Sequence, residues 1–171
     1  MSSMAAIILV SFFGNILAVS AAPATSQVDP NFFPGVQTGL GSWFRANNRD
    51  DHTVGHSWCN YEYHDDDLIF APCLKAMGGA TYYTDKKKWK ESIAKYCGLE
   101  AKVTDPSTGK SMLLYVGDSF EDAYCRGPGW IDIMIGPFKQ LHGDPKGNKN
   151  YDINNVHWEL TGKKNPRYSA P

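Results

Sequence analysis

Turn-forming residues interrupt this sequence at short intervals, so its regular elements are limited to short strands and brief helices. The 171 residues include 16 Gly and 10 Pro, and both residue types mark turns through their backbone preferences. Aromatic side chains are abundant at 13 %. This combination favours a β-rich fold, and the length allows one domain with tails.

Local patterns predict five short strands and two helices. Strands are expected over 39–44, 67–71, 99–104, 111–116 and 156–160, and helices over 86–96 and 133–141. Thr84 or Asp85 would cap the first helix, and Asp132 precedes the second. An open sheet of so few strands would leave bare edges, whereas closure into a small barrel removes them.

The charge of the chain argues against a nucleic-acid partner, and its polar runs argue against a metal site. Seventeen Lys and Arg face 18 Asp and Glu, giving a formal charge of −1. Nucleic acid is therefore not expected as a partner, because phosphate contacts need a basic face. The basic run Lys86–Lys88 is interpreted as a solvated helix face. A polar run of His and Asp over 50–67 has metal-ligand chemistry, but adjacent loop residues give poor ligand geometry, so we expect no metal and no cofactor.

The N-terminus has the features of a secretory signal. Residues 1–22 contain no charged side chain, and a short apolar run gives way to small residues. Val19 and Ala21 fit the −3 and −1 positions, which predicts cleavage after Ala21. The apolar run is interrupted and is short for a bilayer span of about 20 residues. We therefore expect a secreted, extracellular protein with no membrane partner.

The remaining chain divides into three parts. Residues 22–37, rich in Pro and small polar residues, are expected to form an N-terminal extension that Phe32 and Phe33 pin to the body. The folded domain is expected over 38–162, and the polar residues 163–171 are expected to be a flexible tail. We expect this single domain to be a monomer.

Four cysteines follow the signal segment, at Cys59, Cys73, Cys97 and Cys125. An even count in an exported chain predicts two disulfides. A zinc site built from the four thiolates is the alternative, but the cysteines are widely spaced and no CxxC occurs. From spacing alone, three pairings remain open.

An ordered set of motifs resembles a known family. It runs from Gly-Leu-Gly-Ser-Trp-Phe (39–44) through Asp67–Ala71, Cys97-Gly98 and Leu114–Asp118 to Gly129–Ile133, and closes with Val156 and Trp158. This order resembles the double-psi β-barrel of the expansin and rare-lipoprotein-A families, especially the single-domain expansin-like proteins that fungi secrete. The resemblance covers about residues 38–161. It implies an all-β fold, a six-stranded double-psi β-barrel with two short helices, and a surface groove for a cell-wall polysaccharide.

The resemblance also implies which carboxyl groups lie in that groove, namely Asp118 and Asp132. Cleaving a glycosidic bond needs a protonated acid at the leaving oxygen. A second carboxylate nearby raises the pKa of that acid by like-charge repulsion, and an apolar wall such as Trp130 acts in the same direction. Each residue has an ordinary structural interpretation as well: Asp132 as a helix N-cap, and Asp118 as a turn residue that bonds its own loop.

Sugar contacts and disulfides follow from the same resemblance. Pyranose rings lie on flat aromatic planes, and polar groups at the rim bind their hydroxyls. The candidate sugar contacts are Ser42, Trp43, Tyr115, Phe120, Tyr124 and Trp130, whereas Trp89 and Trp158 are assigned to the core. Phe120 stands where expansin-like proteins have a tyrosine. The family pattern pairs Cys59 with Cys97, which leaves Cys73 with Cys125.

Departures from the family pattern decide between functions. Ile133-Met134 follows Asp132 where the family has Leu-Ser, and the first strand carries no carboxylate. Without a general base, inverting hydrolysis has nothing to activate water. We therefore favour non-hydrolytic binding and loosening of a cell-wall polymer such as glucan, cellulose or chitin. The alternatives are an endoglucanase or lytic transglycosylase with Asp132 as general acid, and a secreted protease inhibitor or effector that binds a protein through loops 45–66 and 143–154.

Overall fold

The fold was determined as a computed structural model, which describes residues 32–171. The expected signal peptide, residues 1–21, and residues 22–31 of the expected extension lie outside the described residues. Within 32–171, none of the helices has the length and apolar character needed to cross a bilayer.

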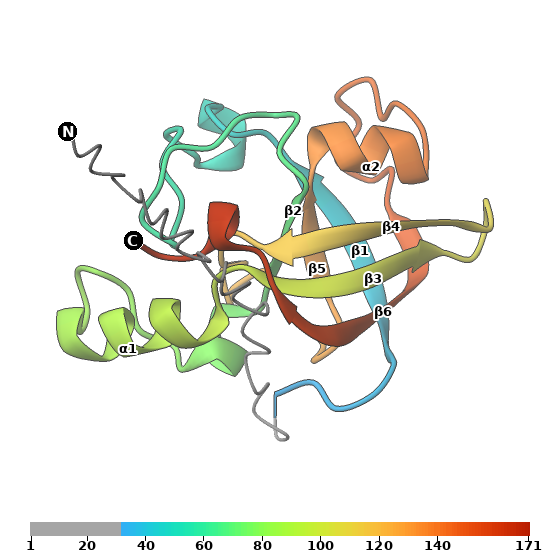
Figure 1. Cartoon of the computed structure of the whole chain (residues 1–171). Helices are drawn as coiled ribbons and strands as arrows, with labels where there is room; N and C mark the ends of the chain where they lie inside the picture. The colour runs from blue at the N-terminus through green and yellow to red at the C-terminus, as the bar shows by residue number, and fades with distance from the viewer. Residues whose placement is uncertain (1–31) are drawn as a thin grey trace, which may run out of the picture.

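Six strands form a closed barrel, shown in Figure 1. They are β1 (Gln37–Phe44), β2 (Ile69–Pro72), β3 (Leu99–Asp105), β4 (Lys110–Val116), β5 (Ile131–Met134) and β6 (Ile153–Lys164). Around the barrel the order is β1-β5-β2-β4-β3-β6, in which β1–β5 and β2–β4 are parallel pairs. Because every strand has two neighbours, no edge is left unpaired, as expected for so few strands.

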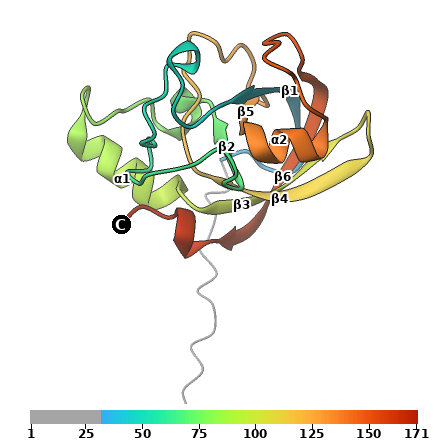
Figure 2. The same cartoon turned by 90° about the horizontal axis from the view of Figure 1, so that it is seen from above.

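Two α-helices lie on opposite sides of this barrel, as Figures 1 and 2 show. They are α1 (Lys86–Tyr96) and α2 (Ile135–Leu141), and three short 3₁₀ helices cover Arg49–Asp51, Leu74–Met77 and Pro166–Tyr168. Asp85 caps α1 by accepting a hydrogen bond from the Lys88 N–H at 3.0 Å. The expected all-β, six-stranded barrel with two short helices is confirmed.

One element differs from the local sequence prediction. Residues 131–134 form strand β5, whereas the pattern placed them at the end of a loop and the start of a helix. A short apolar run such as Ile-Asp-Ile-Met-Ile cannot be assigned to strand or helix by periodicity alone. Pairing with β1 on one side and β2 on the other decides for a strand. Helix α2 begins only at Ile135, with Met134 at its N-cap, so Asp132 is not a helix cap.

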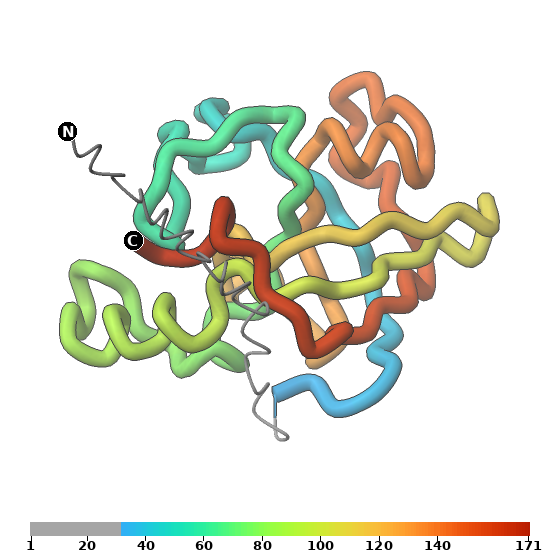
Figure 3. Tube along the Cα trace, in the orientation of Figure 1, coloured from blue at the N-terminus to red at the C-terminus, as the bar shows by residue number. Residues whose placement is uncertain are grey.

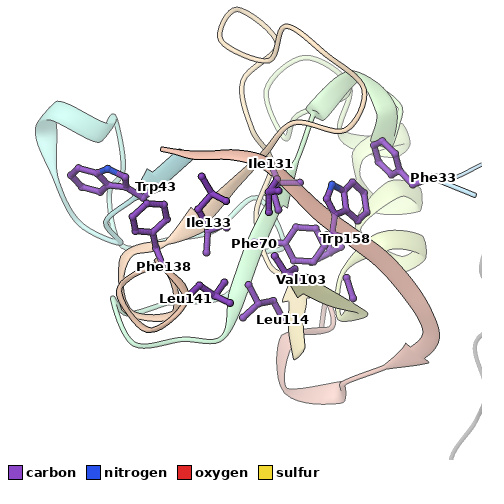
Figure 4. Close-up of a cluster of buried hydrophobic side chains, with 14 of the residues drawn as sticks. Phe33, Trp43, Phe70, Val103, Leu114, Ile131, Ile133, Phe138, Leu141 and Trp158 are labelled. Carbon is purple, nitrogen blue, oxygen red and sulfur yellow. The ribbon is translucent and has the colours of Figure 1, made fainter. Parts of the chain in front are cut away.

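A large cluster of buried hydrophobic side chains forms the core of the barrel, as Figure 4 shows. Phe70, Ile131, Ile133 and Trp158 are essentially inaccessible to solvent. The ring of Phe33 packs edge-on against that of Trp158, 4.6 Å between centroids. Phe33, at the start of the described residues, is therefore packed on the barrel core.

Two disulfides hold the loops to the barrel. Cys59 pairs with Cys97, and Cys73 pairs with Cys125. The first joins the β1–β2 loop to the C-terminal end of α1. The second joins the end of β2 to the β4–β5 loop. The pairing that the family resemblance implied is confirmed.

The C-terminal residues pack against the barrel, although their polar composition led us to expect a flexible tail from residue 163. Strand β6 continues to Lys164, and Tyr168 beyond it is buried. The Tyr168 ring stacks on that of Tyr115 at 5.2 Å, and Arg167 forms an ion pair with Asp67 at 2.7 Å. Two residues, Tyr168 and Ala170, provide the apolar contacts of this segment, so its average composition gave no sign of them.

Candidate functional site

The site is built around Asp132 in the middle of β5. Successive side chains of a strand point to opposite faces, so Ile131 and Ile133 enter the core while Asp132 points outward. In the sheet Asp132 lies between Ser42 of β1 and Ala71 of β2. Ser42 Oγ donates a hydrogen bond to Asp132 Oδ1 at 2.9 Å. The small Ala71 side chain leaves the other flank of the carboxyl group open.

Asp118 approaches the same site from the loop after β4. Its Oδ1 accepts hydrogen bonds from the backbone N–H groups of Trp58 and Ser119, each at 2.8 Å. Burial raises the pKa of Tyr63 above its ordinary value, so its hydroxyl stays protonated, and its presence beside Asp118 favours the ionised form of that carboxyl group. Asp118 thus bonds its own turn, as the structural interpretation proposed, and also fixes the β1–β2 loop across the site.

Both carboxyl groups have raised pKa values, and burial is the main cause. Desolvation raises the pKa of Asp132 to about 7 and that of Asp118 to about 6, from an ordinary value of 3.8. The Ser42 hydrogen bond and the charge of Lys149 oppose the shift at Asp132. Repulsion from Asp118, which the sequence argument emphasised, contributes less than burial. Near neutral pH, a large fraction of Asp132 is therefore protonated.

A third carboxylate, Asp51, lines the same groove but is fully engaged. Arg45 Nε and Lys149 Nζ each lie 2.7 Å from one of its oxygens. Burial raises the pKa of Asp51, but the hydrogen bonds from Arg45 and Lys149 outweigh burial and hold it below the ordinary value. Its side chain is 1 % exposed. Asp51 is thus ionised but inaccessible, a poor candidate for a base that activates water.

The carboxyl groups face a groove of about 760 Å³. Most of its lining residues come from three loop segments, namely the β1–β2 loop (residues 45–68), the segment before α1 (residues 78–85) and the β4–β5 loop (residues 117–130). Figure 3 follows these loops along the chain trace. Aromatic side chains line much of the groove, namely Phe44, Trp58, Tyr63, Tyr82, Tyr83, Trp89, Phe120 and Tyr124. Tyr83 is 93 % exposed and Tyr124 54 % exposed, so the rim offers aromatic faces to a ligand.

The groove contains some of the residues expected from the sequence and not others. Four of the expected residues line it, namely Asp118, Phe120, Tyr124 and Asp132. Ser42 is not in the lining but is hydrogen-bonded to Asp132. Three other expected sugar contacts do not line it.

The three expected sugar contacts that lie outside the groove lining, Trp43, Tyr115 and Trp130, pack against other parts of the protein. Trp43 is buried against Phe138, with Lys149 Nζ 3.6 Å from its ring centroid. Tyr115 stacks on Tyr168. The Trp130 ring lies against Gly127, outside the groove lining.

Sequence reasoning missed several groove residues, chiefly Trp58, Tyr63, Tyr82 and Tyr83. All of them lie in irregular segments, where no periodic pattern marks a side chain as facing a site. The adjacent pair Tyr82–Tyr83 gave no clear signal either, because the adjacent pair Phe32–Phe33 is buried in the core. Within residues 32–171, no group of three or more His, Cys, Asp or Glu side chains is arranged to hold a metal ion.

The fold and the groove define a double-psi β-barrel protein. Among solved structures, the papain inhibitor of Streptomyces (SPI) is similar at 15 % identity and a TM-score of 0.51, over 74 % of this chain and 94 % of that one. A mutant of the Clavibacter michiganensis expansin, in complex with cellohexaose, is similar at 15 % identity and a TM-score of 0.47, over 74 % of this chain and 50 % of that one. No protein-family model and no curated protein matches the sequence. At this level of identity, the likeness to the papain inhibitor shows the fold alone.

Proposed function

We propose that this is a secreted protein that binds a cell-wall polysaccharide in the groove and loosens it without cleaving bonds. One observation carries the proposal: two carboxyl groups of raised pKa and a set of aromatic side chains line one open groove. Aromatic planes suit the C–H faces of pyranose rings, and the carboxyl groups suit their hydroxyls. A ligand with both kinds of surface, repeated along a chain, is a polysaccharide.

Loosening rather than hydrolysis is supported by the state of the carboxyl groups. A protonated Asp132 donates a hydrogen bond to a sugar oxygen and competes with the hydrogen bonds between polymer chains. Inverting hydrolysis requires, in addition, a free carboxylate that activates water on the other face of the sugar. Asp51 is held by two cations, and Asp118 already accepts hydrogen bonds from the backbone N–H groups of Trp58 and Ser119. Glu121, the remaining carboxylate of the groove lining, is an exposed residue of the β4–β5 loop and not a residue fixed on the barrel.

Secretion is part of the proposal and has independent support. Disulfides persist in oxidising compartments, and the described cysteines are all paired in two disulfides. The signal-like N-terminus points in the same direction. Analysis of the N-terminal residue of protein collected from the medium tests this, and Ala22 is the expected first residue.

The test of function combines retention and product analysis. Purified protein is mixed with insoluble cellulose and chitin, and the bound fraction, the mechanical creep of a polymer sheet and the soluble reducing ends are measured. We expect retention and creep without new reducing ends. New reducing ends or anhydro-sugars would establish the enzymatic alternative, with Asp132 as general acid. Asp132→Asn is expected to abolish creep, whereas Asp66→Asn, an exposed residue outside the groove, is expected to leave it unchanged.

A second candidate function is binding to a protein, as in a protease inhibitor. The rim carries exposed apolar side chains, with Val54 at 78 % and Tyr83 at 93 % exposure, and long loops on a rigid barrel suit protein contacts. The similar Streptomyces structure is that of a papain inhibitor. Inhibition of papain by the purified protein, with no retention on polysaccharide, would favour this candidate over loosening.

A further inference from the structure

Helix α1 carries an unusual concentration of positive charge. Its eleven residues contain five lysines and one acid, Glu91, in a chain of formal charge −1. Lys86, Lys87, Lys88 and Lys90 are exposed, and none of these four forms an ion pair with any described residue. We call these four side chains the lysine cluster. Overall charge does not account for it, because the rest of the chain is more acidic than basic.

The lysine cluster is unfavourable for the helix that carries it. The N-terminal end of a helix has a partial positive charge, so cations in the first turn are destabilising. Lysines four residues apart, such as Lys86 and Lys90, also repel each other. The first turn itself contains no acidic residue, and a single N-cap carboxylate, Asp85, precedes all four lysines of the cluster. Helix stability therefore gives no reason for the cluster, and an anionic ligand does.

The lysine cluster adjoins the groove through Tyr82. Lys86 Nζ lies 4.7 Å from the centroid of the Tyr82 ring and donates a hydrogen bond to the Tyr82 hydroxyl at 3.1 Å. Tyr82 lines the groove, as does Trp89, which sits one turn along α1 from Lys86. Lys90 follows Lys86 at a spacing of four, on the same face of the helix. A polymer that leaves the groove over Tyr82 therefore meets Lys86 and then Lys90.

We infer that the polymer bound by this protein is acidic, with carboxylate groups on its sugars that bind the lysine cluster where the chain leaves the groove. The inference rests on the proposed function and narrows its substrate class from neutral glucan to uronate-bearing polysaccharide. Each exposed ion pair contributes little to the free energy of binding, but the contributions of several pairs along one polymer add up, and salt weakens all of them. A neutral glucan offers the lysines only hydroxyl groups.

The groove carboxyls are compatible with an acidic polymer in mild acid. Burial raises the pKa of Asp132 to about 7 and that of Asp118 to about 6, so both are largely neutral at pH 5. A sugar carboxylic acid of ordinary pKa, near 4, is still largely ionised there. Among the other charged or titratable side chains of the groove lining, Asp51 is paired with Arg45 and Lys149, and His52, His56 and Glu121 lie on loops. Repulsion of the polymer by Asp118 and Asp132 is thus small at pH 5 and grows towards pH 8, so the affinity is expected to fall in that direction.

Polygalacturonate and its fully methyl-esterified form provide a matched pair of probes, because they differ in charge and not in sugar. Binding of the purified protein to each is measured at pH 5 over a range of salt. We expect tighter binding to polygalacturonate, with a preference that shrinks as salt increases. Lys86→Gln with Lys90→Gln is expected to weaken that binding about 3–10-fold and to leave binding to the ester unchanged. Lys102→Gln with Lys163→Gln makes the same charge change on β3 and β6, outside the groove lining, and should have no effect.

The outcomes separate this inference from the proposed function. Equal binding to both polymers, or unchanged binding of the Lys86 and Lys90 variant, would overturn the acidic substrate and leave polysaccharide binding in place. Failure to bind any polysaccharide would overturn both. Binding to phosphatidylserine vesicles with the same affinity and salt dependence would show an unspecific cationic surface, and that too would overturn the inference. Far-UV circular dichroism of both double variants establishes that α1 is still folded.

Discussion

Ser42 of β1 donates a hydrogen bond to Asp132 of β5 across a parallel strand pair, with 2.9 Å between the two oxygens. The parallel register sets this contact, so the carboxyl group is held in one orientation by the barrel rather than by a loop. Because a hydroxyl donor serves both the neutral and the ionised carboxyl group, the geometry survives a change of protonation. Asp132 can therefore change charge at the centre of the groove while the barrel stays unchanged.

The first prediction concerns the pH dependence of stability in Asp132→Asn. The pKa of Asp132 is about 7 in the folded chain and near 3.8 when exposed. A raised carboxyl pKa means that the folded state holds the proton more tightly. The associated stability is therefore complete below about pH 4 and is lost as the pH rises through 7. Asparagine resembles the neutral acid and still accepts from Ser42, so it avoids this loss.

We expect Asp132→Asn to match the wild type near pH 4 and to exceed it at pH 8. A gain on the order of 1–2 kcal/mol is expected, reduced from the full shift because the side chain is partly exposed to water. Urea unfolding at both pH values measures the difference, with Asp66→Asn as the control. Uniform destabilisation of Asp132→Asn at every pH would mean that the fold requires the ionised carboxylate.

The second prediction concerns the most exposed aromatic residue of the rim, Tyr83. At 93 % exposure its side chain contributes little to the core, so Tyr83→Ala should change the free energy of unfolding by less than about 0.5 kcal/mol. If a sugar ring stacks there, binding should weaken by about 1 kcal/mol, roughly fivefold. Leu113→Ala on β4, another exposed apolar side chain but outside the groove lining, is the matched control. Equal retention of both variants on polysaccharide would remove Tyr83 from the site.

The positions of Asp118 and Asp132 could be predicted from sequence because a family resemblance supplied the long-range pairing. Local pattern alone failed at Asp132 and placed it before a helix. What makes residues 131–134 a strand is hydrogen bonding to β1 and β2, about 90 and 60 residues away in sequence. That information is not present in the periodicity of the segment itself. The dominant role of burial in raising the pKa of Asp132 likewise depends on loops that close over it.

The aromatic wall could not be predicted because loops form it. Trp58 faces the groove since its backbone N–H bonds Asp118, 60 residues further on, and since the adjacent Cys59 is tied to Cys97. Trp43 illustrates the opposite case. Its flat indole ring made it a candidate sugar contact, but alternation along the strand turns that ring to the other face, where Phe138 and Lys149 cover it.

The third prediction concerns the Cys73–Cys125 disulfide, which ties the loop that carries Tyr124 to the end of β2. Replacing both cysteines with serine should cost about 2–4 kcal/mol of stability, because the unfolded chain gains freedom. Phe120 stays in place through backbone hydrogen bonds with Pro72 and Leu74, whereas Tyr124 loses its anchor. Polysaccharide binding should therefore weaken as much as in Tyr124→Ala.

A double-mutant cycle tests this mechanism. In the serine background, adding Tyr124→Ala should weaken binding little further, whereas adding Phe120→Ala should weaken it as in the wild type. Full additivity of Tyr124→Ala with the loss of the disulfide would show that Tyr124 keeps its position without the bond. Binding is measured at a temperature where the serine variant remains folded by circular dichroism.

The last prediction concerns the C-terminal residues, which pack where composition suggested flexibility. Tyr168 is 3 % exposed, stacks on Tyr115 and has its hydroxyl 3.4 Å from the buried Asp67. Tyr168→Ala should therefore cost about 3–4 kcal/mol, in the range of a buried aromatic residue. Arg167→Ala removes an ion pair whose arginine is 70 % exposed, so its cost should be smaller, near 1 kcal/mol. Thermal unfolding of the two variants ranks them, and a tail that is free in solution would leave both at the wild-type melting temperature.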